Sequence, residues 1–260
     1  MILALDVGNT NIVLGLIENG QISSVAPRIA TDVSKTDYEY AVAIENVLDF
    51  VGVDATEAEG AIISSVVWPL TGVLQSAVKM LTGKTALIVS AGLKTGLNIC
   101  IDDPGQVGAD LVVGAAGALS IAQAPLIVID MGTATTITVV GEGNKFLGGA
   151  ILPGLRLSME ALANGTSLLP MISLEAPKKA ISTNTVECMQ SGAIYGSAAM
   201  LDGMIERMEA ELGSKTTVIA TGGLAGCVTP LCKREIRYEP DLLLKGLAVL
   251  WEKNRRIRRS

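Results

Sequence analysis

The feature that most constrains the fold of this chain is a pattern that occurs twice. A short apolar run ends in an aspartate, one residue and a glycine follow, and two more strand-like runs then form a hairpin. The first copy begins with Ile2–Leu5 and Asp6, and the second begins with Leu126–Ile129 and Asp130. A pattern that recurs after half the chain length predicts an internal duplication, with two lobes of the same strand–hairpin–helix kind.

The remaining periodic segments complete an α/β chain. Apolar residues at helical spacing predict helices over Tyr38–Val51, Leu70–Leu81, Leu111–Ala124, Val186–Leu212 and Leu242–Trp251. Apolar runs predict strands over Gln21–Ile29, Ala61–Val67, Leu87–Val89 and Thr217–Ala220. We therefore expect two duplicated lobes with mixed sheets, an N-terminal lobe of residues 1–115 and a C-terminal lobe of residues 116–260, and a ligand-binding cleft between them.

The composition favours a compact body of the size of an enzyme and argues against other classes. Hydrophobic residues make up 49% of the chain and charged residues 18%, a balance too apolar for a disordered protein. The formal net charge of −6 opposes binding to a nucleic-acid backbone, so no nucleic-acid partner is expected. The basic run from Arg255 to Arg259 is interpreted as a solvated helix end.

The chain has no histidine, which restricts its chemistry. Without a Ser-His or Cys-His pair, a general base has to be a carboxylate, lysine, tyrosine or cysteine. The four cysteines include no Cys-x-x-Cys pair, and we interpret them as reduced thiols of a cytoplasmic protein. No membrane span is expected in the uncharged segment Leu111–Ile129, because its glycines and Pro125 divide it into a helix and a strand. No signal peptide is expected, because Asp6 interrupts the first apolar run.

Both copies of the repeated pattern have the chemistry of phosphate loops. In Asp6-Val7-Gly8-Asn9-Thr10-Asn11, the glycine allows close approach of the backbone, and the polar residues offer donors to a polyphosphate. Asp6 is suited to hold Mg²⁺ directly or through water. A plain hairpin turn explains one such loop equally well, but the second loop at Asp130–Thr136 favours phosphate binding. Thr221-Gly222-Gly223 is a weaker third candidate, where an adenosine could lie against the backbone.

A different segment has the properties of an acceptor site. Gly108 and Ala109 place little bulk before Asp110, which opens a predicted helix. Phosphoryl transfer to an alcohol needs a group that accepts the hydroxyl proton, and Asp110 is the best candidate base in a chain without histidine. An N-cap aspartate for the helix is the alternative interpretation.

Together, these motifs resemble one known family, the type III pantothenate kinases of the acetate and sugar kinase, heat-shock-protein-70 and actin superfamily. The matching segments are Asp-Val-Gly-Asn-Thr-Asn (6–11), Ser-Ser-Val-Val (64–67), Thr-Gly-Leu-Asn-Ile (95–99), Val-Gly-Ala-Asp (107–110), Asp-Met-Gly-Thr-Ala-Thr-Thr (130–136), Phe-Leu-Gly-Gly-Ala-Ile-Leu-Pro-Gly (146–154), Thr-Asn-Thr (183–185), Gln-Ser-Gly (190–192) and Thr-Gly-Gly-Leu-Ala (221–225). The resemblance implies actin-like (ribonuclease H-like) lobes, a central ATP cleft, and ATP-dependent phosphorylation of pantothenate, the first step of coenzyme A synthesis.

The resemblance also implies roles for individual residues. ATP would bind to Asp6, Val7, Gly8, Asn9, Thr10, Asn11, Ile12, Val13 and Thr133. Asp110 would be the catalytic proton acceptor, and the acceptor pocket would be lined by Ile101, Gly108, Ala109, Asp110, Leu111 and Thr185. Asp6 would lie near Mg²⁺, and Asp130 would help to hold a monovalent cation, K⁺ or NH₄⁺. The protein would be a homodimer whose acceptor pocket is completed at the interface.

Two residues depart from the family's usual pattern, and both belong to the acceptor side. Leu111 stands where the family usually has arginine, and Ile101 stands where it usually has an aromatic residue. A guanidinium is a natural partner for the pantothenate carboxylate, so its loss favours a less anionic acceptor. Two alternatives therefore stay open beside pantothenate phosphorylation: a kinase of a less anionic alcohol, and a nucleotide-binding paralogue that acts through protein contacts without turnover.

Overall fold

The computed structural model describes residues 1–255, which form two compact units. Unit 1 comprises Met1–Leu97, Asp102–Ile121 and the C-terminal segment that begins at Leu242, and unit 2 comprises Asn98–Ile101 and Ala122–Asp241. These units differ from the continuous lobes expected over residues 1–115 and 116–260, because the chain returns to unit 1 at its end. Residues 256–259, most of the basic run considered above, lie outside the described residues.

The sheet of unit 1 is mixed and is built around its first strand. Its strands are β1 (Ile2–Val7), β2 (Asn11–Glu18), β3 (Gln21–Val25), β4 (Ile29–Ala30), β5 (Gly60–Ser65) and β6 (Leu87–Ile88). They lie in the order β3-β2-β1-β5-β6, and β4 pairs with β2. β1 is antiparallel to β2 and parallel to β5, so a hairpin lies on one side of it and a crossover strand on the other.

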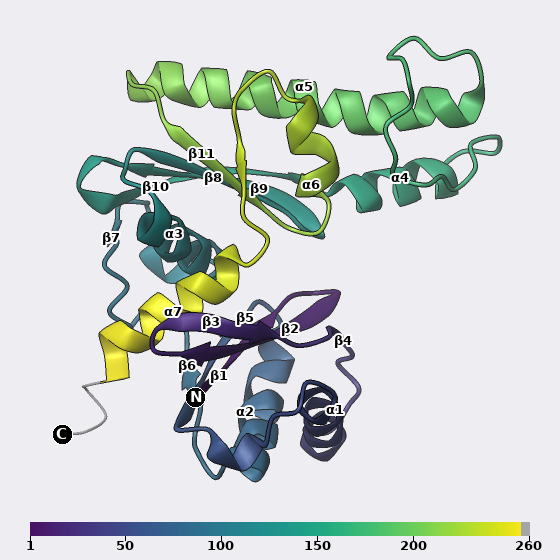
Figure 1. Ribbon diagram of the computed structural model, residues 1–260. Helices are drawn as coiled ribbons and strands as arrows, with labels where there is room; N and C mark the ends of the chain where they lie inside the picture. Colours follow the sequence, from purple (N-terminus) through teal and green to yellow (C-terminus); the bar gives the residue numbers. More distant parts are fainter. Residues whose placement is uncertain (256–260) are drawn as a thin grey trace. The chain divides into compact units, whose positions relative to one another are not determined.

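Helices cover both faces of this sheet. They are α1 (Asp37–Phe50), α2 (Trp68–Thr82), α3 (Ala109–Ile121) and α7 (Leu242–Asn254). α1 and α2 pack on the face that carries Leu3 and Leu5, and α3 and α7 pack on the face that carries Ile2 and Ala4 (Figure 1). Unit 1 therefore has two apolar layers, one on each side of the same strands.

The last helix completes the second layer of unit 1. A side chain at Gly246 would overlap the backbone of Val113 in α3, so α7 and α3 are in direct backbone contact. The side chain of Asn254 accepts the N–H of Lys94 at 3.0 Å and donates to the carbonyl of Lys94 at 3.0 Å. Because Asn254 is buried, this pair of bonds fixes the end of α7 to the segment that follows β6.

The sheet of unit 2 repeats the topology of unit 1. Its strands are β7 (Asn98–Ile99), β8 (Leu126–Met131), β9 (Ala134–Gly141), β10 (Lys145–Pro153), β11 (Thr217–Thr221) and β12 (Arg237–Tyr238). The order β10-β9-β8-β11-β12 matches β3-β2-β1-β5-β6, with β7 added beside β10. β8 is antiparallel to β9 and parallel to β11, as β1 is to β2 and β5. The predicted duplication is therefore confirmed.

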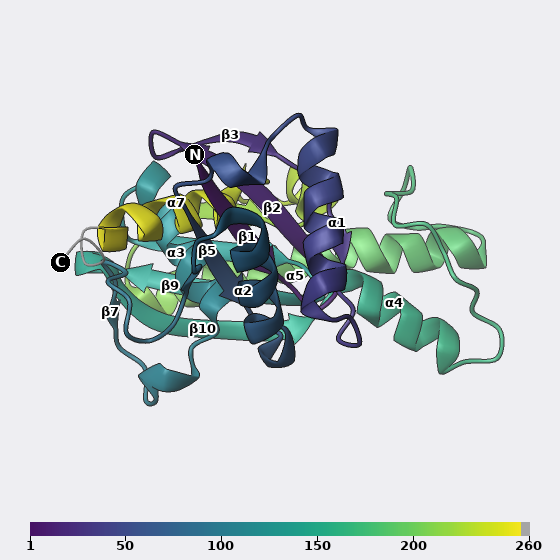
Figure 2. The same ribbon diagram turned by 90° about the horizontal axis from the view of Figure 1, so that it is seen from below.

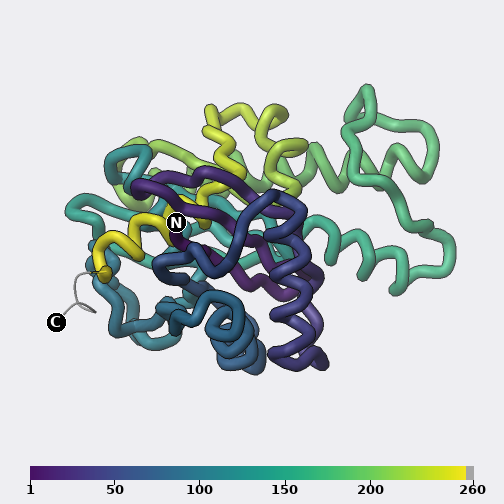
Figure 3. The backbone as a smooth tube through the Cα atoms, turned by 60° about the horizontal axis from the view of Figure 1, so that its bottom comes forward, coloured from purple at the N-terminus to yellow at the C-terminus, as the bar shows by residue number. Residues whose placement is uncertain are grey.

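The helices of unit 2 are α4 (Leu155–Asn164), α5 (Thr185–Leu212) and the short α6 (Ala225–Val228). α5 packs through Ile194, Leu201 and Ile205 against apolar residues of β8, β9 and β11. α4 and the first turns of α5 extend beyond the strands of unit 2 (Figure 2), and the segment between them, residues 165–184, extends with them (Figure 3). In the described part of the chain, no helix is both long and apolar enough to cross a bilayer.

Most predicted elements are confirmed, but the third strand is not continuous. The expected strand Gln21–Ile29 is broken after Val25, and Ile29 begins a separate short strand, β4. Pro27 lies in the break, and proline cannot donate a hydrogen bond to a neighbouring strand. α1 begins at Asp37, one residue before the predicted Tyr38, and Thr36 and Glu39 form a reciprocal capping box at its start.

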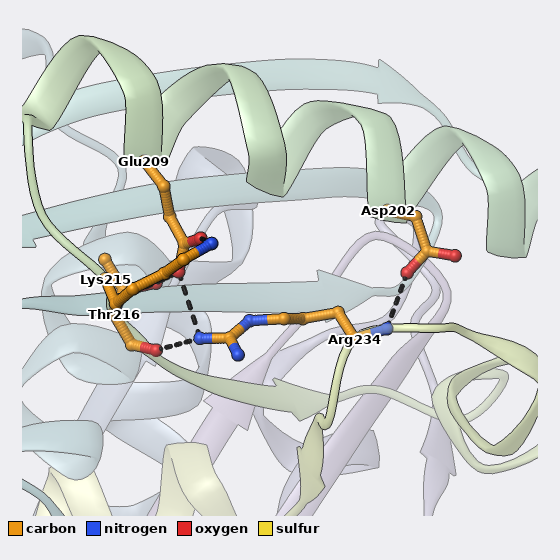
Figure 4. A network of polar contacts seen from close by, with 5 residues as sticks. All are labelled: Asp202, Glu209, Lys215, Thr216 and Arg234. Carbon is orange, nitrogen blue, oxygen red and sulfur yellow. Dashed lines mark hydrogen bonds and ion pairs between the residues drawn. The ribbon is translucent and has the colours of Figure 1, made fainter.

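A buried ionic network joins α5 to the segments before β11 and before β12 (Figure 4). Glu209 is 5% exposed, and its carboxylate binds Lys215 Nζ at 2.7 Å, Thr216 N at 2.8 Å and Arg234 Nη2 at 3.0 Å. Asp202, two turns earlier, accepts the backbone N–H groups of Lys233 and Arg234. Burial alone would raise the pKa of Glu209, but the hydrogen bonds from Lys215 and Thr216 and the charge of Arg234 lower it to about 2.

Replacement of Glu209 by Gln is expected to lower the free energy of unfolding by about 3 kcal/mol at pH 7, because Arg234 loses its counter-charge. The folded-state pKa lies below the ordinary 4.5, so the stabilisation is full above pH 4.5 and is lost as the pH falls toward 2. Urea unfolding at pH 7 and pH 3 measures this difference. Glu206→Gln, at an exposed position of the same helix, is the control; an equal loss at both pH values would contradict the charge-based explanation.

Candidate active site

The first predicted phosphate loop lies at the carboxyl end of β1 in unit 1. The N–H of Gly8 donates to the carbonyl of Asn11 at 3.0 Å, which closes the turn between β1 and β2. Thr31 supports the loop from outside, since its hydroxyl donates to the carbonyl of Gly8 at 2.7 Å and its N–H donates to the carbonyl of Thr10 at 3.0 Å. These bonds hold the backbone of the turn, and Asn9 and Thr10 are exposed at its tip.

Asp6 is the next-to-last residue of β1, just before this loop, and it is half-buried. It pairs with Val13 of β2, and its neighbours Ile2 and Ala4 at alternate positions of β1 lie in the cluster under α3 and α7. Strand side chains alternate between faces, so Asp6 lies on the α3 side of the sheet. Val7 and Ile12 are buried on the opposite face and serve the core under α1 and α2.

Asp110 lies on the same side of unit 1, in the first turn of α3. It is the second residue of the helix, so the alternative interpretation as N-cap is wrong by position. A side chain at Gly108 would overlap Asp110 Oδ1, which shows that the carboxylate folds back over Gly108. Burial raises the pKa of Asp110 above its ordinary 3.8, although hydrogen bonds from the backbone of Leu111 and of Asp110 itself oppose the shift. A half-buried carboxylate with a raised pKa is typical of a general base.

The second predicted loop lies at the carboxyl end of β8 in unit 2. The N–H of Gly132 donates to the carbonyl of Ala134 at 3.0 Å, and the N–H of Gly154 donates to the carbonyl of Thr133 at 3.1 Å. Thr133 is exposed at the tip of this turn. The loop is one residue shorter than its counterpart in unit 1, since two residues rather than three separate its strands.

Two glycines bring other segments of unit 2 against this loop. Gly222 has φ +94°, and a Cβ atom there would lie 2.6 Å from the carbonyl of Met131 and 2.7 Å from Asp130 Oδ1. A side chain at Gly154 would overlap the carbonyl of Thr133. The structure therefore brings Asp130, Thr133 and the Thr221-Gly222-Gly223 segment together. Gly154 was not predicted as a separate site residue, although its place between the end of β10 and the start of α4 was a possible signal.

The two acceptor-side residues of unit 2 lie apart from each other. Thr185 is the exposed first residue of α5, capped by Asn184, whose Oδ1 accepts the N–H of Glu187 at 3.0 Å. It lines a cavity of about 600 Å³ with an apolar wall of Met159, Leu162, Leu169 and Met189. Ile101 does not line this cavity; it lies beside Gly148 at the β7 edge of the sheet.

The donor set fits a magnesium ion that is held mainly by a nucleotide. Within residues 1–255, no three or more acidic, cysteine or histidine side chains gather into a metal site. Mg²⁺ bound to ATP needs only one or two protein carboxylates, because phosphates and waters fill the other positions. Asp6, at a strand end beside a closed turn with exposed donors, meets that requirement.

Solved structures with a related fold include two that were solved with ATP analogues. An activator of 2-hydroxyisocaproyl-CoA dehydratase from Clostridium difficile, solved with ADPNP, matches with a TM-score of 0.56 and 12% identity over 99% of this chain and 97% of that one. A ROK family glucokinase from Streptomyces griseus, in complex with glucose and AMPPNP, matches with a TM-score of 0.53 and 13% identity over 98% and 99%. The duplicated ribonuclease H-like units thus define an actin-like fold of the sugar-kinase class.

The sequence comparison identifies the family within this class. Residues 2–207 match the family described as type III pantothenate kinase. The type III pantothenate kinase of Moorella thermoacetica is 40% identical over 98% of this chain and 100% of its own length, and that of Halalkalibacterium halodurans is 41% identical over the same shares. The chain belongs to the type III pantothenate kinase family.

Replacement of Gly222 by Ala is expected to displace the Asp130–Thr133 loop and to lower the free energy of unfolding by more than about 1 kcal/mol, since it adds a clash to the cost of a positive φ. Urea unfolding measures the loss. Gly143→Ala is the matched control, because Gly143 has φ +69° but open space around its Cα. Equal losses in the two variants would show that Gly222 is needed for backbone conformation alone.

Proposed function

We propose that this kinase transfers the γ-phosphoryl group of ATP to the primary hydroxyl of pantothenate, with Asp110 as the general base. The half-buried carboxylate of Asp110, at the start of α3 and on the same face of unit 1 as Asp6, is the observation that carries the proposal. In the transfer, Asp110 accepts the hydroxyl proton while the alkoxide oxygen bonds to the γ-phosphorus. The bond from phosphorus to the bridging oxygen breaks, and ADP leaves.

The two loops have complementary tasks in this proposal. Donors of residues 8–11 and of Thr133 bind the phosphates, and the segment at Gly222 offers a flat backbone surface to the adenosine. Asp6 would hold Mg²⁺, and the ion would supply positive charge that offsets the charge of the phosphates. Asp130, next to Gly222, is the proposed ligand of a monovalent cation, K⁺ or NH₄⁺. The free cysteines favour a cytoplasmic location.

Pantothenate is favoured over a less anionic alcohol by the close relatives, and over a non-catalytic role by the environment of Asp110. A protein that only binds nucleotide gains nothing from a carboxylate whose pKa is raised by burial. Leu111, which stands beside Asp110 in the first turn of α3, leaves the pantothenate carboxylate without the expected arginine. Another cation therefore has to neutralise this carboxylate, or its binding is weak.

Asp110→Asn is expected to lower pantothenate-dependent ADP release by about 10²–10⁴-fold and to leave the affinity for MgATP unchanged. A coupled ADP-release assay with K⁺, with and without pantothenate, measures the first effect, and calorimetric titration measures the second. In the unmodified enzyme, kcat/KM should fall as the pH falls through the pKa of Asp110, which lies above 3.8, because only the deprotonated base accepts a proton.

One result would decide against this assignment. An absence of stimulation by pantothenate, with nucleotide binding intact, would favour one of the two alternative functions. A screen of neutral alcohols then separates these, since only a kinase of another acceptor consumes ATP in an acceptor-dependent way. Asp102→Asn, at an exposed carboxylate of the same unit, is the control for a general effect of lost charge.

We also propose that the functional form is a homodimer that pairs through α4, α5 and the segment between them. Large apolar side chains are exposed on these elements at Leu157, Leu162, Leu168, Met171, Ile181 and Val186. Leu168 is 88% exposed and Ile181 is 87% exposed. Each is next in sequence to a residue that lines the same cavity as Thr185, namely Leu169 and Ser182. A second copy of the chain would cover this surface, and the family resemblance implies that it also completes the acceptor pocket.

The double substitution Leu168→Glu and Ile181→Glu is expected to convert the dimer into a monomer and to remove pantothenate-dependent activity. Light scattering after size-exclusion chromatography measures the mass. Both side chains are already exposed, so the fold of unit 2 should survive. Phe50→Glu, at an exposed apolar residue of α1, should remain dimeric. A wild-type protein that is monomeric at micromolar concentration would contradict the proposal.

A further inference from the structure

Ser64 is a buried polar residue whose hydroxyl has no partner. Its side chain is completely buried in β5, and among the described residues no group lies within hydrogen-bonding reach of Ser64 Oγ. The adjacent Ser65 is different, because its hydroxyl donates to the carbonyl of Val67 at 3.2 Å and accepts the N–H of Val67 at 3.1 Å. The chain therefore satisfies one serine of this pair internally and leaves the other unsatisfied.

The position of Ser64 connects it to the nucleotide site. β5 runs parallel to β1, and Ser64 lies directly opposite Asp6 in the register. Ile62, two residues earlier on the same face, packs in the cluster under α3 and α7, as do Ile2 and Ala4 of β1. Ser64 and Asp6 are therefore neighbours on one face of the sheet. This is the face that α3 covers, and Asp110 lies in the first turn of that helix.

An unsatisfied buried hydroxyl destabilises the folded chain, and alanine would fill the same space without this cost. Hydroxyl groups both donate and accept, which suits them to bind ordered water. Mg²⁺ keeps several of its own waters when it binds a nucleotide, and these waters need partners in the protein. Ser64, the neighbour of Asp6 in the sheet, is placed to be such a partner.

We propose that Ser64 is a positioning residue that hydrogen-bonds to a water of the hydrated Mg²⁺ at Asp6 when nucleotide is bound. The proposal rests on the proposed nucleotide site and adds a residue to it. Ser64 acts through the water and the ion, so its removal should affect the contribution of Mg²⁺ to nucleotide affinity and leave affinity without Mg²⁺ unchanged.

The test compares Ser64→Ala with the wild type and with Ser65→Ala. Affinity for a non-hydrolysable ATP analogue is measured by calorimetry with Mg²⁺ and with EDTA, and stability is measured by urea unfolding without ligand. Ser64→Ala is expected to reduce the gain in affinity from Mg²⁺ by about five- to tenfold, the size of one hydrogen bond. It should also raise the urea midpoint of the free protein, because an unsatisfied hydroxyl is removed.

Ser65→Ala should lower the urea midpoint and leave the gain in nucleotide affinity from Mg²⁺ unchanged. An unchanged gain from Mg²⁺ in Ser64→Ala would overturn the role of Ser64 while leaving the nucleotide site intact. A lower midpoint in Ser64→Ala would also overturn it, since the hydroxyl would then have a partner within the chain. A wild type that binds the analogue no better with Mg²⁺ than with EDTA would overturn the metal site at Asp6 and this role together.

Discussion

The structure depends on one arrangement of hydrogen bonds that occurs in both units. The first strand of each unit pairs in antiparallel fashion with its successor and in parallel fashion with a strand that arrives later. A central strand held on both sides cannot slip in register, because a shift of one residue would place its buried side chains on the wrong face. Asp6 and Asp130 are therefore fixed at equivalent ends, and each is followed within two residues by a glycine of a short turn.

The duplicated scaffold has been adapted differently in the two units. In unit 1, the longer loop is supported by Thr31, and the covering helix α3 carries Asp110. In unit 2, the shorter loop is in contact with Gly154 and Gly222. Any residue with a side chain at either position would displace the loop. The proposed base thus belongs to unit 1, while the glycine contacts that crowd a loop backbone belong to unit 2.

The sequence predicted the repeated strands, the helices and the family, because each depends on local periodicity or on short motifs. It did not predict features that depend on distant contacts. Glu209 and Arg234 are 25 residues apart and look like two surface charges, yet they form one buried network. Ser64 is unremarkable in a serine pair until the register places it beside Asp6. The break between β3 and β4 could have been predicted locally from Pro27, but no local pattern predicted that α7 would pack in unit 1.

That return has a consequence for how the protein is made. The layer of α3 and α7 over the first sheet contains residues from the beginning, the middle and the end of the chain. During synthesis, the strands of unit 1 emerge first, but one apolar face stays incompletely covered until Leu242–Asn254 leaves the ribosome and joins α3. Unit 2, whose segments are nearly continuous, can fold earlier. Unit 1, which carries the proposed base, is therefore finished last, because its second apolar layer needs α7.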